Sequence, residues 1–368
     1  MITHALAMIT TAILVSTPAL RAERLAFPSG IGTSILEYGA IPDDGQDDTR
    51  AIRAALSDER TEDVDYYGRP KCLFFPAGTY NVSDTLSWRG CAVTVQGEGA
   101  GVTIIRLADA TPLFGNSSAP RAVIRTPSGN MAFRHNFHDL TVNTGSGNPG
   151  AIGLDYISSN CGTVKNVSIV SEDRSGVAGL DMTRQWPGPL LIKNLTVTGF
   201  DCGIRVAHSE YGPTFENITL VNQNAAGIDN DGNILAIRNL STSGTVPAIR
   251  NPVSWGYVIV LDSRFNGGGA SISAIESGGL VYARNVTVDG AFQSVIRQKG
   301  AVVPGKTVGE YVSDSVYSLW EDAPKRSLGL AIAETPEYHD QDTARWGRYE
   351  GRWYGDMGVV QPAERSTM

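Results

Sequence analysis

The chain has few charged side chains and few residues that bind metals. Its 368 residues include 30 Lys and Arg against 38 Asp and Glu, which gives a net charge of −8. This acidic balance argues against nucleic acid as a partner, and against tight binding of a polyanion unless a cation bridges the two. With four cysteines, five histidines and no Cys-x-x-Cys or His-x-x-x-His spacing, the sequence predicts no metal site and no cofactor. Cys72 and Cys91 either face each other on neighbouring coils or are separate core thiols.

Long apolar runs are missing beyond the first residues. No run after residue 22 is long enough to span a membrane, so no membrane partner is expected. Residues 1–22 contain the apolar stretch Ala5–Val15 and small residues at Ala19 and Ala22. This pattern predicts a signal peptide and a secreted or periplasmic protein; the alternative is a buried first strand or helix.

The sequence is rich in a short repeat. Seven Asx residues, 22 to 28 positions apart, each open a short alternating segment: Asp139, Asn166, Asn194, Asn217, Asn239, Asp262 and Asn285. A second column of aliphatic residues keeps step with them: Leu154, Leu180, Ile204, Ile228, Ile249, Ile275 and Ile296. Each repeat therefore holds at least two short strands, and apolar stripes of helical period are missing. The pattern predicts an all-β solenoid of parallel strands, whose coils bury a core by stacking.

Five of the Asx residues lie in Asn-x-Ser/Thr sequons, namely Asn166, Asn194, Asn217, Asn239 and Asn285. Glycosylation is one interpretation. Their equivalent place in every coil favours the other interpretation, a ladder of side-chain amides that bond between coils and at turns.

An amphipathic helix is expected before the regular coils. Asp47, Asp48 and Thr49 are residue types that cap a helix N-terminus. Ile52, followed by Ala55 and Leu56, then forms one apolar face. Such a helix would cover the open end of the core and its exposed strand edges.

Three motifs in chain order carry a family resemblance, at 38–56, 73–80 (Leu-Phe-Phe-Pro-Ala-Gly-Thr-Tyr) and 95–105. Together they resemble the pectate-lyase-like, rhamnogalacturonase/epimerase-type superfamily. The later coils, at 188–197 and 215–220, resemble the N-terminal β-helix of bacterial proteins related to glycoside hydrolase family 55. The resemblance implies a right-handed parallel β-helix that acts on carbohydrate. In family 55-like proteins a second β-helix carries the catalytic acid, so this chain is also interpreted as one half of such a pair.

A charged column is expected on one outer face. The residues that follow the aliphatic column are Asp155, Asp181, Arg205, Asp229, Arg250, Glu276 and Arg297. Because side chains alternate along a strand, inward aliphatics place this column outward, with a rise of about 4.8 Å per coil. One interpretation is a ladder of ion pairs that stabilises the sheet. The other is that some of the carboxylates flank a sugar at the spacing of a glycosidase pair.

The segment Arg205–Gly212 is richest in groups that suit catalysis. Our hypothesis assigns general acid/base chemistry to Glu210, with Asp181 or Asp229 as its partner. The expected substrate-binding residues are Trp186, Arg205, His208 and Tyr211, with Trp186 and Tyr211 as aromatic platforms. The alternative is that they only cover the solenoid. A lyase would need carboxylates holding Ca²⁺, for which Asp229-Asn-Asp231 offers oxygen ligands without the full calcium-loop pattern.

The expected organisation is a signal peptide over 1–22, a β-helix domain over 23–335 and an aromatic-rich tail over 336–368. Within the β-helix domain, the cap covers 35–60 and the regular coils cover about 130–300. The favoured function is an exported glycoside hydrolase that cleaves a polysaccharide or oligosaccharide, with a neutral glucan preferred. The alternatives are a polysaccharide lyase and a non-catalytic carbohydrate-binding or structural β-helix. The oligomeric state does not follow from the sequence.

Overall fold

The computed structural model describes residues 24–26, 32–58, 71–130, 132–314, 348–349 and 352–353. The predicted signal peptide (1–22) lies outside these residues, as does most of the predicted aromatic-rich tail. No helix among the described residues is long and apolar enough to cross a membrane.

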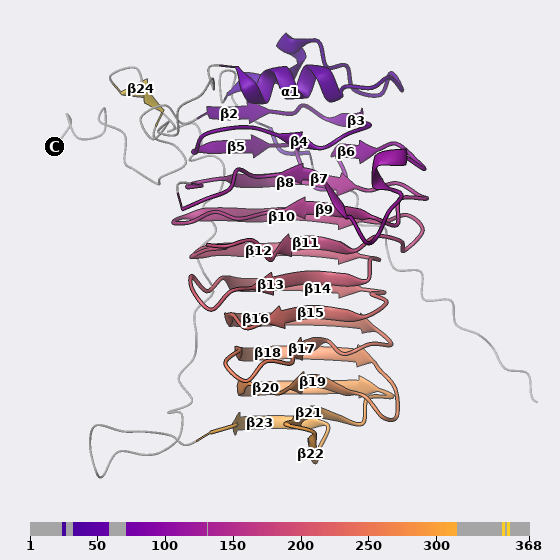
Figure 1. Cartoon of the computed structure of the whole chain (residues 1–368), viewed down its shortest axis with the longest axis vertical. Helices are drawn as coiled ribbons and strands as arrows, with labels where there is room; N and C mark the ends of the chain where they lie inside the picture. Colours follow the sequence, from indigo (N-terminus) through magenta and orange to yellow (C-terminus); the bar gives the residue numbers. More distant parts are fainter. Residues whose placement is uncertain are drawn as a thin grey trace, which may run out of the picture.

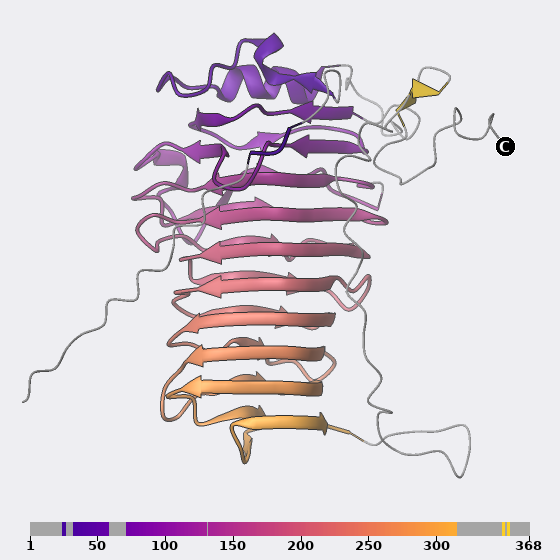
Figure 2. The same cartoon turned by 180° about the vertical axis from the view of Figure 1, so that it is seen from behind.

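The chain winds into a solenoid of stacked coils, and from β8 to β21 each coil adds one strand to each of two sheets (Figure 1). Sheet A contains 13 strands: β1 (Thr33–Ser34), β2 (Lys71–Phe74), β3 (Gly78–Val82), β5 (Val93–Gln96), β6 (Thr103–Leu107), β8 (Asn136–Asn143), β10 (Gly162–Val170), β12 (Leu190–Thr198), β14 (Thr214–Val221), β16 (Ile234–Gly244), β18 (Tyr257–Gly267), β20 (Leu280–Gly290) and β23 (Thr307–Val312). Its long strands lie one above the next in Figure 2.

Sheet B contains the 10 shorter strands: β4 (Leu86–Ser87), β7 (Arg121–Arg125), β9 (Ala151–Asp155), β11 (Ala178–Met182), β13 (Cys202–Ala207), β15 (Ala226–Asp231), β17 (Ile249–Asn251), β19 (Ser273–Ser277), β21 (Ser294–Gln298) and β22 (Ala301–Val303). The strands pair in parallel from coil to coil until the C-terminal end, where β22 pairs antiparallel with β21 in sheet B and β23 pairs antiparallel with β20 in sheet A. A separate hairpin joins β24 (Arg348–Tyr349) and β25 (Arg352–Trp353). The predicted parallel β-helix is confirmed.

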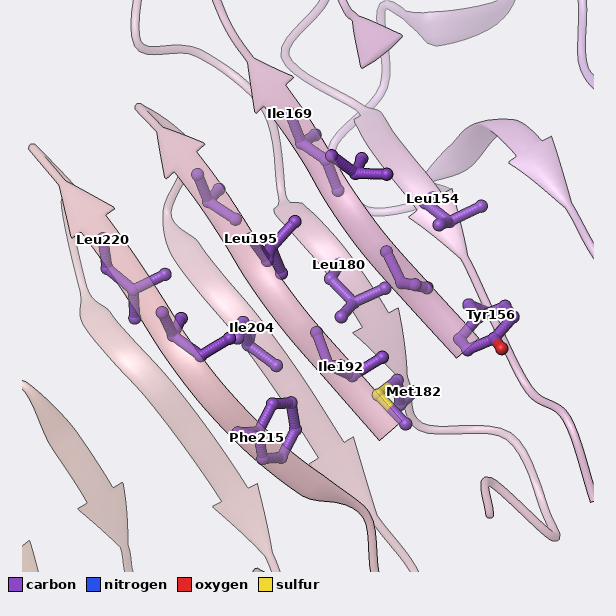
Figure 3. Packing of buried hydrophobic residues seen from close by; sticks show 14 of the residues in the cluster. Leu154, Tyr156, Ile169, Leu180, Met182, Ile192, Leu195, Ile204, Phe215 and Leu220 are labelled. Carbon is purple, nitrogen blue, oxygen red and sulfur yellow. The ribbon is translucent and has the colours of Figure 1, made fainter. Parts of the chain in front are cut away.

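The aliphatic column forms the core as predicted. Each of its seven residues pairs with the next across sheet B, and all are fully buried. Figure 3 shows Leu154, Leu180 and Ile204 pointing toward Ile169 and Leu195 of sheet A. Stacking completes the removal of these side chains from water, since a single coil leaves its apolar residues open to the coils above and below.

The Asx column forms the predicted amide ladder inside sheet A. Asn194 Nδ2 donates to Asn166 Oδ1 at 2.8 Å, and Asn217 Nδ2 donates to Asn194 Oδ1 at 3.0 Å. Asn166 continues the ladder to Asp139 at 2.8 Å, and Asn239 joins it from the other side at 2.8 Å. The seven Asx residues all have φ between 50° and 57°, a left-handed conformation that Asn and Asp tolerate better than most residues. Each long strand therefore bends at its Asx residue.

Helix α1 (Thr49–Ser57) lies over the N-terminal end of the stack (Figure 1). Its Ile52, Ala55 and Leu56 are buried, which confirms the predicted apolar face. The first-turn amide of Thr49 is capped by Asp47 Oδ1 at 2.9 Å, whereas Asp48 instead accepts from the Ile41 amide at 2.9 Å. Two short 3₁₀ turns, η1 (Ile35–Tyr38) and η2 (Pro112–Phe114), complete the helical content among the described residues.

Of the two alternatives for Cys72 and Cys91, a direct pairing across neighbouring coils is not found, because the two residues are not opposite each other in the register. Cys72 in β2 pairs with Thr94 of β5, and Cys91 precedes β5 by two positions.

Candidate functional site

The charged column lies on sheet B in the predicted order. Its members are cross-strand neighbours from Asp155 to Arg297, and Arg125 of β7 extends it by one coil. Each carboxylate in it forms an ion pair with an arginine. The contacts on this face are therefore those of the ion-pair ladder that was one of the two interpretations.

Asp181, a candidate catalytic residue, is almost completely buried, with 3% exposure. Its carboxylate accepts hydrogen bonds from the Thr183 amide at 2.9 Å and from the Thr183 hydroxyl, and contacts Arg205 Nη1 at 3.2 Å. Asp181 therefore lies below the surface, and its ion pair with Arg205 orients that arginine.

Asp155, one coil earlier, lies between two arginines. Arg184 Nε donates to Asp155 Oδ1 at 2.6 Å, and Arg125 Nε lies 3.2 Å from Oδ2. Burial raises the pKa of Asp155 above its usual range, although both arginines act in the opposite direction. Burial also lowers the pKa of Arg184, whose guanidinium bonds Ser128 and Thr126 as well. Arg184 thus holds the turn after β11 to the two coils before it, those of β9 and β7.

Asp229, the other candidate partner, is held by a bidentate contact. Arg250 Nε and Nη2 each donate to one of its oxygens at 2.8 Å. Two parallel bonds from a planar guanidinium fix both the position and the orientation of the carboxylate. The Asp229 side chain is 20% exposed, so a ligand can still reach it.

A hollow of about 870 Å³ opens where the strands of sheet B end. Strands β13, β15 and β17 contribute most of its wall, and the turns that follow β11 and β17 close it. The lining residues are Thr183, Arg205, Val206, Ala207, His208, Ser209, Asp229, Asp231, Arg250, Pro252 and Trp255.

Three predicted site residues meet in this hollow: Arg205, His208 and Asp229. Glu210 and Tyr211 follow His208 in the same exposed turn but are not part of the lining. Trp186 lies half-buried in the turn one coil earlier, and Asp181 lies below Arg205. The predicted residues therefore gather at one corner of the solenoid, where the chain passes from sheet B to sheet A.

The sequence analysis did not identify Trp255, the most exposed aromatic residue among those that line the hollow. Trp255 is 65% exposed and lies in the turn 252–256 between β17 and β18. Asp231, which we considered only as a calcium ligand, is exposed at the end of β15 beside Ala207 of β13, the strand of the preceding coil. The repeat could have identified Trp255. It follows the aliphatic-column residue of its own coil by a few positions, as Trp186 and Tyr211 do in theirs.

A metal was expected here only if the protein were a lyase. Among the described residues, no group of three or more His, Cys, Asp or Glu side chains is close enough together to hold one. Asp229 and Asp231 supply two carboxylates, and one of them is already bonded to Arg250.

Comparison with solved structures shows the fold. A protein described as ORF18 of Geobacillus virus E2 matches with a TM-score of 0.52 at 14% identity, over 73% of this chain and 59% of that one. Pectin methylesterase from Aspergillus niger matches with a TM-score of 0.46 at 16% identity, over 77% and 93%. The A-module of mannuronan C-5 epimerase AlgE6 from Azotobacter vinelandii matches with a TM-score of 0.41 at 15% identity, over 72% and 89%.

The chain thus spans about three-fifths of the viral protein that it resembles. No curated protein matches its sequence. A family model described as "Rhamnogalacturonase A/epimerase, pectate lyase-like" matches residues 32–273, from the N-terminal cap through the hollow. The chain belongs to this rhamnogalacturonase A/epimerase, pectate-lyase-like family.

Proposed function

We propose that the protein is carbohydrate-active and binds a polysaccharide or oligosaccharide in the hollow at the end of sheet B. The observation that carries this proposal is the chemistry of the lining. Trp255 presents a largely exposed ring beside carboxylate, guanidinium and imidazole groups. An aromatic face with a few convergent polar groups is the arrangement that orients a ligand with both apolar and hydroxyl surfaces, as sugar rings have.

The charge of the hollow favours a neutral sugar. Arg205 and Arg250 are balanced by Asp229 and Asp231, and Arg205 is also paired with Asp181 below. No excess of positive charge is therefore left to attract a polyuronate, and the whole chain carries a charge of −8. A neutral glucan is accordingly the preferred substrate class.

The proposed reaction is glycoside hydrolysis. Arg250 fixes the position and orientation of the Asp229 side chain, which suits a base that activates water. Asp231 lies two residues further along β15 on the same face of the strand, roughly 7 Å from Asp229 along the backbone, so two carboxyl groups are presented side by side at this end of the sheet. Glu210 is exposed in the turn above, and either Glu210 or Asp231 can supply the acid.

One observation favours a non-catalytic function instead. Asp181 and Asp229 are both engaged by arginines, and this is the arrangement of a structural ion-pair ladder. A protein that binds glycan without cleaving it would use Trp255 and the polar rim of the hollow in the same way.

A panel of glucans and uronic-acid polymers tests the reaction. Release of reducing ends without unsaturated, ultraviolet-absorbing products indicates hydrolysis, and unsaturated products indicate a lyase. The variants Asp229→Asn, Asp231→Asn and Glu210→Gln should include at least one that lowers turnover by about 100-fold or more. Asp201→Asn, at the opposite corner, is the control. Full turnover in all three site variants would refute the assignment, and binding without any product would support the non-catalytic function.

We also infer that the protein is exported. The apolar stretch Ala5–Val15, followed by Ala19 and Ala22, supports this proposal. Expression of the full chain, with sequencing of the mature N-terminus, tests it: cleavage after Ala19 or Ala22 is expected, and an intact cytoplasmic N-terminus would contradict it.

A further inference from the structure

We propose that the corner between sheets B and A binds an extended glycan that runs parallel to the solenoid axis, across successive coils. The surface is defined by four side chains, Trp186, Tyr211, Ile234 and Trp255, and is called the corner stripe. The proposal rests on the proposed carbohydrate function and adds the length and direction of the ligand.

The turns that carry the corner stripe stack directly on one another. A Cβ placed on Gly188, in the Trp186 turn, would lie 2.5 Å from the carbonyl oxygen of Tyr211. A Cβ on Gly212 would lie 2.3 Å from the carbonyl oxygen of Ile234. These backbones are in contact without room for a side chain, so the first three members of the stripe follow one another coil by coil.

Trp255 continues the same stack. The amide of Tyr257 donates to the carbonyl of Asn233 at 3.0 Å, which joins the Trp255 turn to the turn before β16. A Cβ on Gly232 would lie 2.4 Å from Trp255 Nε1, so the indole rests against that neighbouring turn. The stripe therefore spans three coil steps, or about 14 Å at 4.8 Å per step.

The stripe faces solvent, which an aliphatic or aromatic row on a single soluble protein seldom does without a function. Tyr211 is 39% exposed, Ile234 is 47% exposed and Trp255 is 65% exposed, and Trp186 is partly exposed. Trp255 belongs both to the stripe and to the hollow, so a ligand held in the hollow can continue along the stripe.

The backbone at the stripe is held in an uncommon conformation. Trp186 has φ = 61°, Tyr211 has φ = 61°, and His208 between them has φ = 70°. Bulky side chains in the left-handed region are disfavoured, and such positions cluster at ligand-binding sites. In contrast to the ladder asparagines, these residues make no repeated amide bond that would account for the conformation.

A glycan fits this surface better than a protein or a lipid. Each turn of the stripe also carries an exposed or partly exposed polar residue shortly before its stripe residue, namely Gln185, Glu210, Asp231 and Ser254. A sugar chain likewise presents apolar ring faces together with hydroxyl groups in every unit. The rise between coils is comparable to the length of one sugar unit, so successive units can meet successive coils.

Binding of linear neutral gluco-oligosaccharides, from disaccharide to hexasaccharide, tests the proposal by calorimetry. Affinity should increase with length up to about four units and then level off. Trp186→Gly should weaken binding of the tetrasaccharide and longer ligands roughly ten-fold while leaving the disaccharide unchanged. Trp255→Ala, at the hollow, should weaken binding of all lengths. Glycine adopts φ = 61° without strain, so Trp186→Gly removes the ring and spares the turn.

Leu113→Ala is the matched control, because Leu113 is an exposed apolar residue in η2, away from the stripe, at 46% exposure. Equal affinity for short and long ligands, or an unchanged tetrasaccharide affinity in Trp186→Gly, would contradict binding along the corner stripe. Neither result would contradict binding in the hollow. Absence of binding by the unmodified protein to every neutral oligosaccharide and polymer would overturn both proposals. A loss of affinity in Leu113→Ala equal to that in Trp186→Gly would also contradict the stripe.

Discussion

The amide ladder offers the sharpest test of how the coils hold together, and Asn194 lies at its centre. Replacing Asn194 by Ala removes two hydrogen bonds: the one that its Nδ2 donates to Asn166 and the one that its Oδ1 accepts from Asn217. Both of those neighbours then keep a partly buried polar atom without its ladder partner. The substitution also places an alanine at φ = 53°, a conformation that costs Ala more than Asn.

The expected cost divides into two parts. Each hydrogen bond contributes about 1 kcal/mol net, so losing both costs about 2 kcal/mol. The left-handed backbone adds roughly 1–2 kcal/mol for Ala. Asn194→Gly loses the same two bonds but adopts the left-handed conformation without strain. Glycine also makes the unfolded chain more flexible, which lowers the stability of the folded protein by about 0.5–1 kcal/mol. We therefore expect Ala to be the worse substitution by about 1 kcal/mol.

Urea unfolding followed by far-ultraviolet circular dichroism measures the difference, with the slope checked for constancy. Asn194→Asp provides an intermediate case, because it keeps the acceptor for Asn217 and loses only the donor to Asn166. The reasoning is refuted if Ala and Gly cost the same, or if Gly costs more, since the left-handed conformation would then not contribute. A total loss under about 0.5 kcal/mol for Ala would show that the ladder bonds add nothing net.

Two further predictions concern buried charge. Burial lowers the pKa of His138 to about 3. The unfolded chain, with a pKa near 6.5, therefore takes up the proton first as the pH falls, and stability should fall by about 1.4 kcal/mol per pH unit between roughly pH 6 and 4; urea titrations should show this dependence reduced in His138→Gln. Arg205→Met should destabilise by about 2 kcal/mol, because it leaves the buried Asp181 without its cation. Arg250→Met should cost under about 1 kcal/mol, because Asp229 is more exposed, and equal costs in thermal unfolding would contradict the burial argument.

The fold could be predicted from the sequence because the same pattern of Asx and aliphatic residues occurs seven times. The spacing of Leu154, Leu180 and Ile204 placed them on one inward column, and the strand period then placed Asp155, Asp181 and Arg205 outward. The ladder through Asn194 followed from the same spacing. Each inference depended only on period and alternation, which are local properties of the chain.

The site was predicted less completely. The turn with His208, Glu210 and Tyr211 was identified from its composition, and Arg205 and Asp229 from the column. The sequence did not show that Asp229 is engaged by Arg250, because ion pairing depends on which side chains reach across a coil. The family pattern contributed the fold and the substrate class, and the residue assignments in the hollow remain predictions.

By itself, the sequence determined the coil period, the inward and outward columns and the cap helix, because stacking repeats bury their apolar residues in one way only. The tertiary structure decided where the turns project. The turn between β15 and β16 has two residues, whereas that between β13 and β14 has six, so the corner is uneven and a hollow forms beside the short turn. Trp255 lines that hollow. It lies 69 positions after Trp186 in the sequence, but the two residues share one corner because the winding of the chain stacks their turns three coils apart.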